Sequence, residues 1–501
     1  MLLLLLMRRI WKYLTLVAAA VLLASSCNTH KDDPEETTSG HSALYSCVNT
    51  FAYNVLTTYY LWIDEIRSKM STWYLSDEPI AKVKELRYKD ASGKDIDRWT
   101  VLTDNVASFL ATVSGTGRTY GYEVRLYRRS ADSDEIVAVI IYTYKDSPAE
   151  KAGLKRGDVI AKVNGKKMTM DNYSSIVNSE LYGSDSVKLT MLNGSELSLT
   201  SVSMYEDPVG TTAIFDLENR KVGYLHFTSF TLDACGPLID VCRQFREASI
   251  TDLVLDLRYN GGGYVKTEEL LASLLAPEKA VKREDVFTTQ VYNTTLTEAL
   301  GSEPTKFTTQ FAFTIDDKKY EYNTSGANAN IEHLWVLTSG STASASESLI
   351  CGLAPYLDIT LVGEKTSGKY CGGVIIETTD WFENVKDKIE KDMYNKGMRL
   401  AANWGIYVMI SRYADKDGKT LSMPDGITPD YECVDMPLDG HELGDPKETM
   451  LAYVLGLIGG KQTNVQTKSS IPAIPVPMPK WSGSIILPED IPFINGEVIL
   501  K

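Results

Sequence analysis

The sequence predicts an α/β protein in which a domain with a mainly parallel sheet flanked by helices follows a β-rich domain and a small helical N-terminal domain. Apolar β runs alternate with helical segments across residues 206–440, and this alternation is typical of a parallel sheet. A helical pattern in residues 43–117 and a β-rich pattern in residues 118–205 precede it. A chain of 501 residues has room for about two to four domains, so this division fits its length.

The N-terminal residues have the order of an export signal. Arg8 and Arg9 precede an apolar run that ends near Ala24. This run is shorter than the about 20 apolar residues that a membrane-spanning helix needs. We therefore expect residues 1–26 to be a signal peptide.

A lipid anchor is expected at Cys27. The small residues before it resemble a bacterial lipobox, which implies that Cys27 carries the lipid and opens the mature lipoprotein. Residues 27–42 are polar and acidic and should form a disordered tether. The implied location is the bacterial cell envelope, with the chain lipid-anchored at the outer membrane and facing either the periplasm or the cell surface.

Charge and metal-ligand content exclude several functional classes. The net charge of −15 argues against nucleic acid as a partner, because phosphate binding needs a basic surface. The seven cysteines and five histidines form no CxxC, Cys/His or HExxH spacing. We therefore expect no metal site and no zinc peptidase. No organic cofactor is expected either.

The segments around the parallel sheet differ in character. Apolar residues recur at helical spacing in residues 43–117. Residues 118–205 combine strand-like runs with the hairpin signal Asn164-Gly165. Residues 441–501 read as a helix followed by a Pro-rich tail.

Within residues 206–440, the apolar runs and the helical spacing place each element of the sheet domain, and residues 278–331 form an insertion with β character. Strands are expected at 221–227, 253–257, 334–337 and 360–362, and helices at 233–247, 266–275 and 345–354.

Three of these strands open into Gly, Ser or Lys at their carboxyl ends. The strand ending at Leu257 runs into Gly261–Gly263, the next ends shortly before Ser344, and the third ends shortly before Lys369. Parallel strands place their carboxyl ends at one edge of the sheet, where ligands of open α/β sheets bind. We therefore expect Ser344, Lys369 and the glycine loop to meet.

Ser344 and Lys369 have the chemistry of a nucleophile and a base. A serine hydroxyl becomes a good nucleophile when a base takes its proton, and a lysine can be that base when burial lowers its pKa. Ser344 would open a helix, so the backbone N–H of Ala345 and one from the glycine loop could hold an oxyanion.

A phosphate-binding loop is the rival interpretation of Gly363-x-x-x-x-Gly368-Lys369. That motif needs Ser or Thr after the lysine and a helix that begins there. Tyr370 follows instead, and the next residues read as turn and strand, so nucleotide binding is not expected.

The residues around this crevice resemble the C-terminal processing peptidases, or tail-specific proteases, which are Ser/Lys serine peptidases with a PDZ domain. Ser344 matches the middle serine of their Ser-Ala-Ser-Ala-Ser-Glu motif, and Lys369 matches the lysine of their Gly-Glu-x-Thr-x-Gly-Lys motif. Asp256–Gly263 matches their Asp-Leu-Arg-x-Asn-x-Gly-Gly loop. The resemblance spans about residues 118–440.

This resemblance implies roles for the residues that carry it. Ser344 would be the nucleophile and Lys369 the base, with Ala345 and either Gly262 or Gly263 as oxyanion donors. The implied activity is that of a serine endopeptidase that cleaves protein substrates near their C-termini through an acyl-enzyme. Its partners would be protein or peptide substrates and, through the lipid anchor, a membrane.

Residues 118–205 match the position of the family's PDZ domain. PDZ domains bind a peptide C-terminus as an added strand and hold its carboxylate on backbone N–H groups. The loop expected to hold the carboxylate consists of Tyr120, Gly121, Tyr122, Glu123 and Val124.

The sequence departs from the family at Gly373. Many members have a glutamine there, four residues after the lysine, which orients the lysine. Gly373 therefore keeps open an alternative, a catalytically weak or inactive peptide-binding lipoprotein. His226 lies within a strand and is expected to be a packed residue rather than a catalytic one.

Overall fold

The structure is a computed structural model that describes residues 42–71, 73, 76–301, 304–315, 318–420, 425–460, 474–478, 483–494 and 498–500. The described residues from Leu44 onward belong to one compact unit. The predicted signal peptide and Cys27 lie outside the described residues. No described helix has the length and apolar character needed to cross a membrane.

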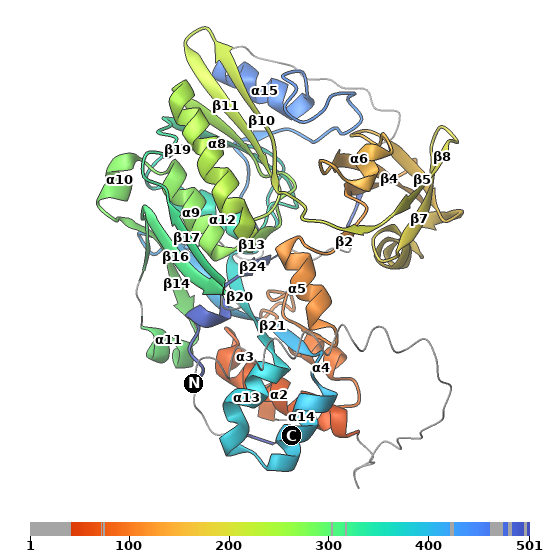
Figure 1. Cartoon of the computed structure of the whole chain (residues 1–501), viewed down its shortest axis with the longest axis vertical. Helices are drawn as coiled ribbons and strands as arrows, with labels where there is room; N and C mark the ends of the chain where they lie inside the picture. The colour runs from red at the N-terminus through yellow and green to blue at the C-terminus, as the bar shows by residue number, and fades with distance from the viewer. Residues whose placement is uncertain are drawn as a thin grey trace. The chain divides into compact units, whose positions relative to one another are not determined.

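A six-stranded sheet lies in the upper left part of the view in Figure 1. Its strands lie in the order β10-β11-β12-β18-β19-β22, and all neighbours except β10 and β11 run parallel. The mainly parallel sheet predicted from the sequence is therefore confirmed. The strands are β10 (Val209–Leu217), β11 (Arg220–Phe227), β12 (Asp252–Asp256), β18 (His333–Thr338), β19 (Asp358–Gly363) and β22 (Tyr431–Glu432).

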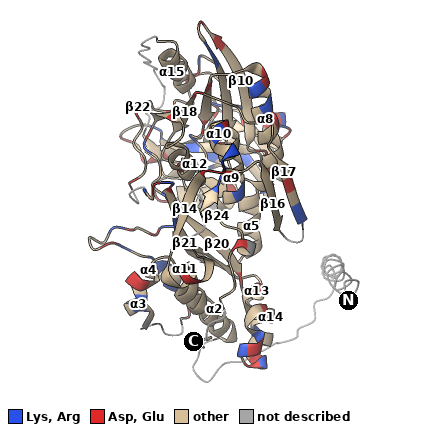
Figure 2. Cartoon of the chain, turned by 90° about the vertical axis from the view of Figure 1, so that its left-hand side faces the viewer, with Lys and Arg blue, Asp and Glu red and all other residues tan. Residues whose placement is uncertain are grey.

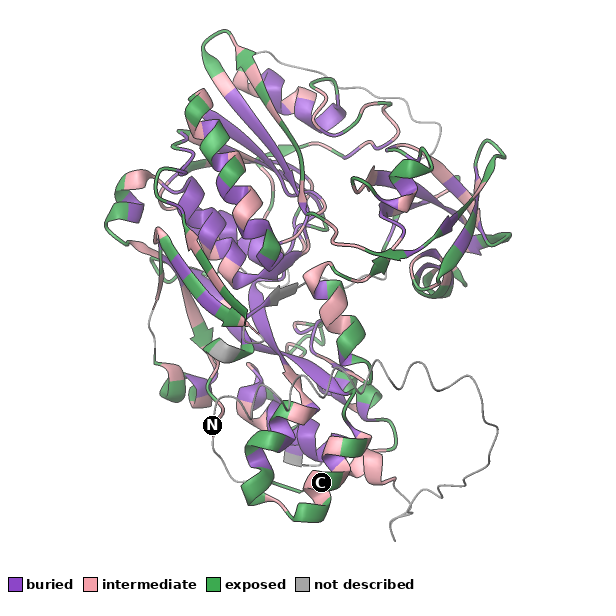
Figure 3. Cartoon of the chain, viewed as in Figure 1, coloured by how far each residue is buried: buried purple, intermediate pink, exposed green. Residues whose placement is uncertain are grey.

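Helices cover both faces of this sheet, which explains why β12 is apolar along most of its length and buried throughout. Side chains of α8 (Cys235–Ala248), α9 (Val265–Leu275) and α12 (Ala345–Leu353) form the core on one face. Residues of α15 (Thr449–Ile458) pack against the other face. Figure 3 shows the buried inner strands beside the exposed outer side of α8.

A second sheet brings together segments from the whole chain, including the expected insertion. It follows the order β13-β24-β20-β21-β14-β15, and β1 pairs with β21 at the side. Its strands are β1 (Val101–Thr103), β13 (Gly262–Tyr264), β14 (Val286–Tyr292), β15 (Thr305–Lys306), β20 (Cys371–Glu377), β21 (Gly405–Asp415) and β24 (Gly483–Ile485).

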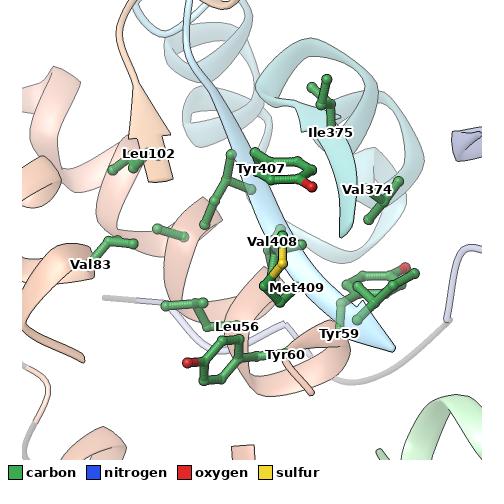
Figure 4. Close-up of a cluster of buried hydrophobic side chains, with 14 of the residues drawn as sticks. Leu56, Tyr59, Tyr60, Val83, Leu102, Val374, Ile375, Tyr407, Val408 and Met409 are labelled. Carbon is green, nitrogen blue, oxygen red and sulfur yellow. The ribbon is translucent and has the colours of Figure 1, made fainter. Parts of the chain in front are cut away.

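The N-terminal helices share one hydrophobic core with this second sheet. Figure 4 shows Leu56 and Tyr60 from the N-terminal part clustered with Val408 and Met409 of β21. Residues 43–117 are therefore helical, as expected, but they also contribute β1. The helices are α2 (Ala43–Tyr59), α3 (Ile63–Ser71), α4 (Pro79–Leu86) and α5 (Val106–Ser114).

The β-rich segment forms its own sheet around a separate core. The sheet has the order β23-β3-β4-β6-β5-β7-β8, with short helices α6 (Pro148–Lys151) and α7 (Tyr173–Ile176). Its strands are β3 (Tyr122–Arg128), β4 (Glu135–Thr143), β5 (Val159–Val163), β6 (Lys166–Thr169), β7 (Ser186–Met191), β8 (Glu196–Thr200) and β23 (Pro475–Val476).

The Pro-rich tail takes part in two sheets rather than only wrapping the surface. Its strand β23 pairs antiparallel with β3, placing Val476 opposite Leu126. Its strand β24 pairs in parallel with both β13 and β20. The tail thus supplies strands to two sheets whose other members belong to earlier parts of the chain, as far back as β3, and apolar periodicity does not reveal such pairing.

The remaining elements lie around these sheets. Figure 2 shows basic and acidic residues interspersed on outer elements such as α8 and α14. The remaining helices are α10 (Glu278–Lys282), α11 (Thr294–Leu300), α13 (Thr378–Val385) and α14 (Lys391–Leu400). The remaining strands pair as β16 (Gln310–Ile315) with β17 (Lys318–Asn323) and as β2 (Arg118–Thr119) with β9 (Val202–Ser203).

Candidate active site

Ser344 lies in the turn between β18 and α12, directly before the first residue of the helix. Its backbone has φ 62° and ψ −111°, a conformation that costs a non-glycine residue free energy. The side chain is buried, and its hydroxyl donates to the carbonyl oxygen of Cys371 at 3.1 Å. Such strain is found where surrounding structure must aim one side chain, as a nucleophile requires.

Lys369 reaches Ser344 from the segment that joins β19 to β20. Its Nζ lies 3.3 Å from Ser344 Oγ and donates to the phenol oxygen of Tyr407 at 3.0 Å. Lys369 has no exposed surface, and burial lowers its pKa from 10.5 to about 8. The structure thus brings the two predicted residues together, and the lowered pKa makes the neutral, basic form of Lys369 available nearer to physiological pH than in a lysine in water.

Glu347 joins the two predicted residues through their backbones. Its carboxylate accepts N–H hydrogen bonds from Ser344 at 2.9 Å and from Gly368 and Lys369, each at 2.8 Å. The Thr366 hydroxyl donates to the same carboxylate. No role for Glu347 was predicted, although an acid three residues after a serine that opens a helix is a known capping signal.

The glycine loop is attached to the turn that carries Ser344. The carbonyl oxygen of Asn260 accepts from the Ala343 N–H at 3.1 Å and from the Ser346 hydroxyl at 3.2 Å. The Asn260 side chain accepts from the Gly262 N–H at 2.9 Å. At Gly263, φ is +142° and a Cβ would lie 2.6 Å from the Phe230 carbonyl oxygen, so only glycine fits.

Ala345 is the first residue of α12 and is fully buried beside Ser344. Its N–H therefore belongs to the N-terminal turn of a helix, where backbone donors favour negative charge. Ala345 and the two glycines predicted as oxyanion donors thus lie on two segments that Asn260 holds together, and the N–H of Gly262 already donates to the Asn260 side chain.

A buried ion cluster holds the start of the glycine loop. Arg258 forms two hydrogen bonds with Asp256, at 2.9 and 2.8 Å, and contacts Glu448 at 2.6 Å and Asp435 at 3.0 Å. Arg156 of the β-rich segment contacts the same Asp435 at 2.7 Å. Asp435 and Glu448 could not be predicted, because nothing in their local sequence ties them to a loop almost two hundred residues earlier.

The predicted carboxylate loop leads directly into β3. Gly121 has φ +79° and donates its N–H to the Thr119 hydroxyl at 2.8 Å. The Val124 N–H donates to the phenol oxygen of Tyr182 at 3.2 Å, and the Tyr182 hydroxyl donates to Glu123 at 3.3 Å.

The aromatic residues of this loop are anchored in the β-rich core. Tyr120 and Tyr122 are buried, and their hydroxyls donate to the carbonyl oxygens of Ser184 and Leu181. These two rings therefore fix the loop, while Tyr182 and the tail strand β23 lie along the outer edge of β3.

His226 is buried on β11 against the rings of Tyr142 and Tyr259. Burial lowers its pKa to about 4, so the imidazole is neutral at physiological pH. Among the residues that the structure describes, no three His, Cys, Asp or Glu side chains gather as a metal site would require.

The comparisons with known proteins agree with this arrangement. Residues 221–433 match the model of peptidase family S41, and residues 139–182 match a PDZ domain model. A carboxyl-terminal-processing protease from Synechocystis sp. is 26% identical over 66% of this chain and 66% of its own length. A CtpA-like serine protease from Staphylococcus aureus is 26% identical over 56% of this chain and 49% of its own length.

The chain thus spans between about half and two thirds of the length of these curated relatives. A solved structure of an S41 protease from Bacteroides fragilis has the same fold. It superposes with a TM-score of 0.60 at 22% identity, covering 82% of this chain and 97% of that one.

Proposed function

Since the chain is a member of peptidase family S41 that carries a PDZ domain, we propose that it is a serine endopeptidase with a Ser344–Lys369 dyad that cleaves proteins near their C-termini. The observation that carries this proposal is the contact between a fully buried lysine and a strained serine, with Nζ and Oγ 3.3 Å apart. A lysine in that environment loses its proton far more easily than one in water.

The first half-reaction forms an acyl-enzyme. Neutral Lys369 takes the hydroxyl proton of Ser344 while Oγ bonds to the peptide carbonyl carbon. The resulting oxyanion is held by the Ala345 N–H and by one N–H of the glycine loop. When the C–N bond breaks, Lys369 gives its proton to the departing amine.

The second half-reaction returns the enzyme to its starting state. Lys369, neutral again, takes a proton from a water molecule as that water attacks the ester carbon. The bond from the carbonyl carbon to Ser344 Oγ breaks, and Lys369 returns the proton to Oγ. No step uses a metal or organic group, in keeping with the chemistry that a Ser/Lys pair supplies by itself.

Recognition of the substrate C-terminus is assigned to the outer edge of β3. The chain's own tail supports this assignment, because β23 already adds to that edge antiparallel, as a PDZ ligand does. Val476 is buried in the core of the β-rich segment, so this edge accepts an apolar side chain. A substrate peptide would displace the tail and take the same pairing.

The chain is further proposed to be anchored by a lipid on Cys27 in the bacterial cell envelope. The small residues that precede Cys27 support this location. Labelling of growing cells with a tagged fatty acid tests it: the wild-type chain should incorporate the label, and Cys27→Ser should not. Equal labelling of both would contradict the anchor.

Cleavage of unstructured polypeptides with apolar C-termini tests the activity. The purified chain should release C-terminal fragments, and Ser344→Ala and Lys369→Ala should each abolish release. Cleavage that survives both substitutions would exclude the dyad. Binding of the polypeptides without cleavage by the wild-type chain would favour the alternative, a peptide-binding lipoprotein that is catalytically inactive.

A further inference from the structure

Gly373 lies on β20 where the neighbouring strand β21 leaves no room for a side chain. A Cβ at this position would lie 2.3 Å from Met409 Cε and 2.7 Å from Tyr407 Cε2. Gly373 does not have the positive φ that would favour glycine for backbone reasons. What glycine provides here is therefore space, and the Tyr407 ring fills it.

Tyr407 uses that space to reach the proposed base. Its ring is buried on β21, and its phenol oxygen accepts a hydrogen bond from Lys369 Nζ at 3.0 Å. Figure 4 shows the ring within the cluster that also holds Ile375 of β20. The oxygens of Ser344 and Tyr407 are thus both within hydrogen-bond distance of the lysine Nζ.

We propose that Tyr407 is a positioning residue that aims Lys369 at Ser344, and that Gly373 is small because Tyr407 occupies the space beside it. The inference rests on the proposed dyad. Gly373 has no side chain that could orient Lys369, and Tyr407 of β21 is inferred to do so instead.

The chemistry of a neutral amine explains why one more acceptor matters. An amine that acts as a base has two N–H donors and a single lone pair. When the Tyr407 oxygen accepts one N–H, rotation about the last carbon–nitrogen bond is fixed and the lone pair can face the Ser344 hydroxyl. Burial raises the pKa of Tyr407 well above 10, so the phenol stays neutral and places no full negative charge beside Lys369.

Other titratable groups also face Lys369, and Tyr407→Phe leaves each of them in the chain. They are Glu347 of α12, Cys371 of β20 and Asp97 of the segment before β1. Each of the three favours the charged lysine. A change in the pH dependence on removal of the phenol oxygen alone therefore reports on Tyr407 itself.

Tyr407→Phe is the decisive variant because it keeps the ring and removes only the acceptor. We expect kcat for cleavage of an unstructured polypeptide to fall roughly tenfold to a hundredfold, with KM within about twofold of wild type. The acid limb of the pH–rate profile should move to lower pH, because an acceptor stabilises the ammonium more than the amine. A purely structural role would change neither the limb nor the split between kcat and KM.

The paired substitutions at position 373 supply the second test. Gly373→Gln alone should lose activity, because its side chain collides with the Tyr407 ring as well as with the end of Met409. Tyr407→Ala removes the ring and gives the flexible end of Met409 room to shift, so the glutamine of the double variant can contact Lys369 and kcat should rise above that of Tyr407→Ala by roughly tenfold. A kcat of the double variant that is equal to or lower than that of Tyr407→Ala would contradict the inference that a glutamine at position 373 can orient Lys369 in place of Tyr407.

A matched control and a readout without turnover complete the experiment. Tyr356→Phe removes a phenol hydrogen bond at the opposite end of α12 from Ser344 and should leave kcat unchanged. The pKa of Lys369 is followed by NMR in the full chain with labelled lysine, and Tyr407→Phe should lower it even if the chain cleaves nothing. A lower pKa in an inactive chain would support the positioning role and contradict the dyad's activity. An unchanged pKa with wild-type kcat would overturn the proposal for Tyr407.

Discussion

Replacing Lys369 by methionine is predicted to stabilise the fold at neutral pH, although it removes the proposed base. Lys369 has no exposed surface, and burial lowers its pKa from 10.5 to about 8. At pH 7 the folded protein therefore carries a buried ammonium that the unfolded chain keeps in water. At about 1.4 kcal/mol for each pKa unit, this difference costs the fold about 3 kcal/mol.

Methionine removes that cost and retains most of the volume of the side chain. Loss of the hydrogen bonds to Ser344 and Tyr407 costs about 1 kcal/mol. The net increase in the free energy of unfolding is therefore about 2 kcal/mol at pH 7. The folded pKa lies below the unfolded pKa, so the folded state binds fewer protons between about pH 8 and pH 10.5. Wild-type stability should rise through that window, and the advantage of methionine should shrink.

Guanidinium unfolding of both proteins at pH 7 and at pH 9.5 measures the effect. The exposed Lys282→Met variant is the control and should differ little from wild type at either pH. A Lys369→Met variant that is less stable than wild type at pH 7 would refute the reasoning. An advantage of equal size at both pH values would also refute it, because it would have a cause other than the buried charge.

Three further predictions concern residues around the dyad and the tail. Glu347→Gln should lower kcat at least tenfold and the free energy of unfolding by roughly 2 kcal/mol, because an amide cannot accept all the N–H groups that the carboxylate accepts. Steady-state kinetics measures kcat and denaturant unfolding measures stability, and an unchanged kcat would contradict this first prediction. Arginines beside Asp435 lower its pKa, so wild-type stability should fall as pH drops below about 4, and Asp435→Asn should cost roughly 3 kcal/mol at pH 7 but less at pH 3. A pH-independent cost in thermal unfolding would contradict this second prediction. Val476→Asp should weaken the pairing of the tail with β3 and thereby free the outer edge of that strand. A peptide with an apolar free C-terminus should then bind the variant several-fold more tightly in a fluorescence anisotropy titration. An unchanged or lower affinity would argue against the outer edge of β3 as the peptide site.

The sequence was most informative where elements are local. The strands before Gly261–Gly263, Ser344 and Lys369 were predictable because each is a short apolar run bounded by small or polar residues. Their convergence followed from the parallel order of β12, β18 and β19.

The second sheet was not predictable in the same way. It joins β1, β20, β21 and β24, which are far apart in the sequence and leave no shared local pattern. The inferred role of Tyr407 could not be predicted for this reason, since it depends on β21 lying beside Gly373. The absence of glutamine at position 373 was visible in the sequence, but the residue that reaches Lys369 in its place was not.

The reactivity of Ser344 across pH tests the central claim most directly. The chain is treated with a serine-directed fluorophosphonate between pH 6 and pH 9.5, and the modified residue is identified by peptide mapping. We predict modification at Ser344, with a rate that rises through about pH 8 as Lys369 loses its proton and that falls roughly a hundredfold in Lys369→Met. Modification of a different serine, or a rate at Ser344 that Lys369→Met leaves unchanged, would contradict the Ser344–Lys369 dyad.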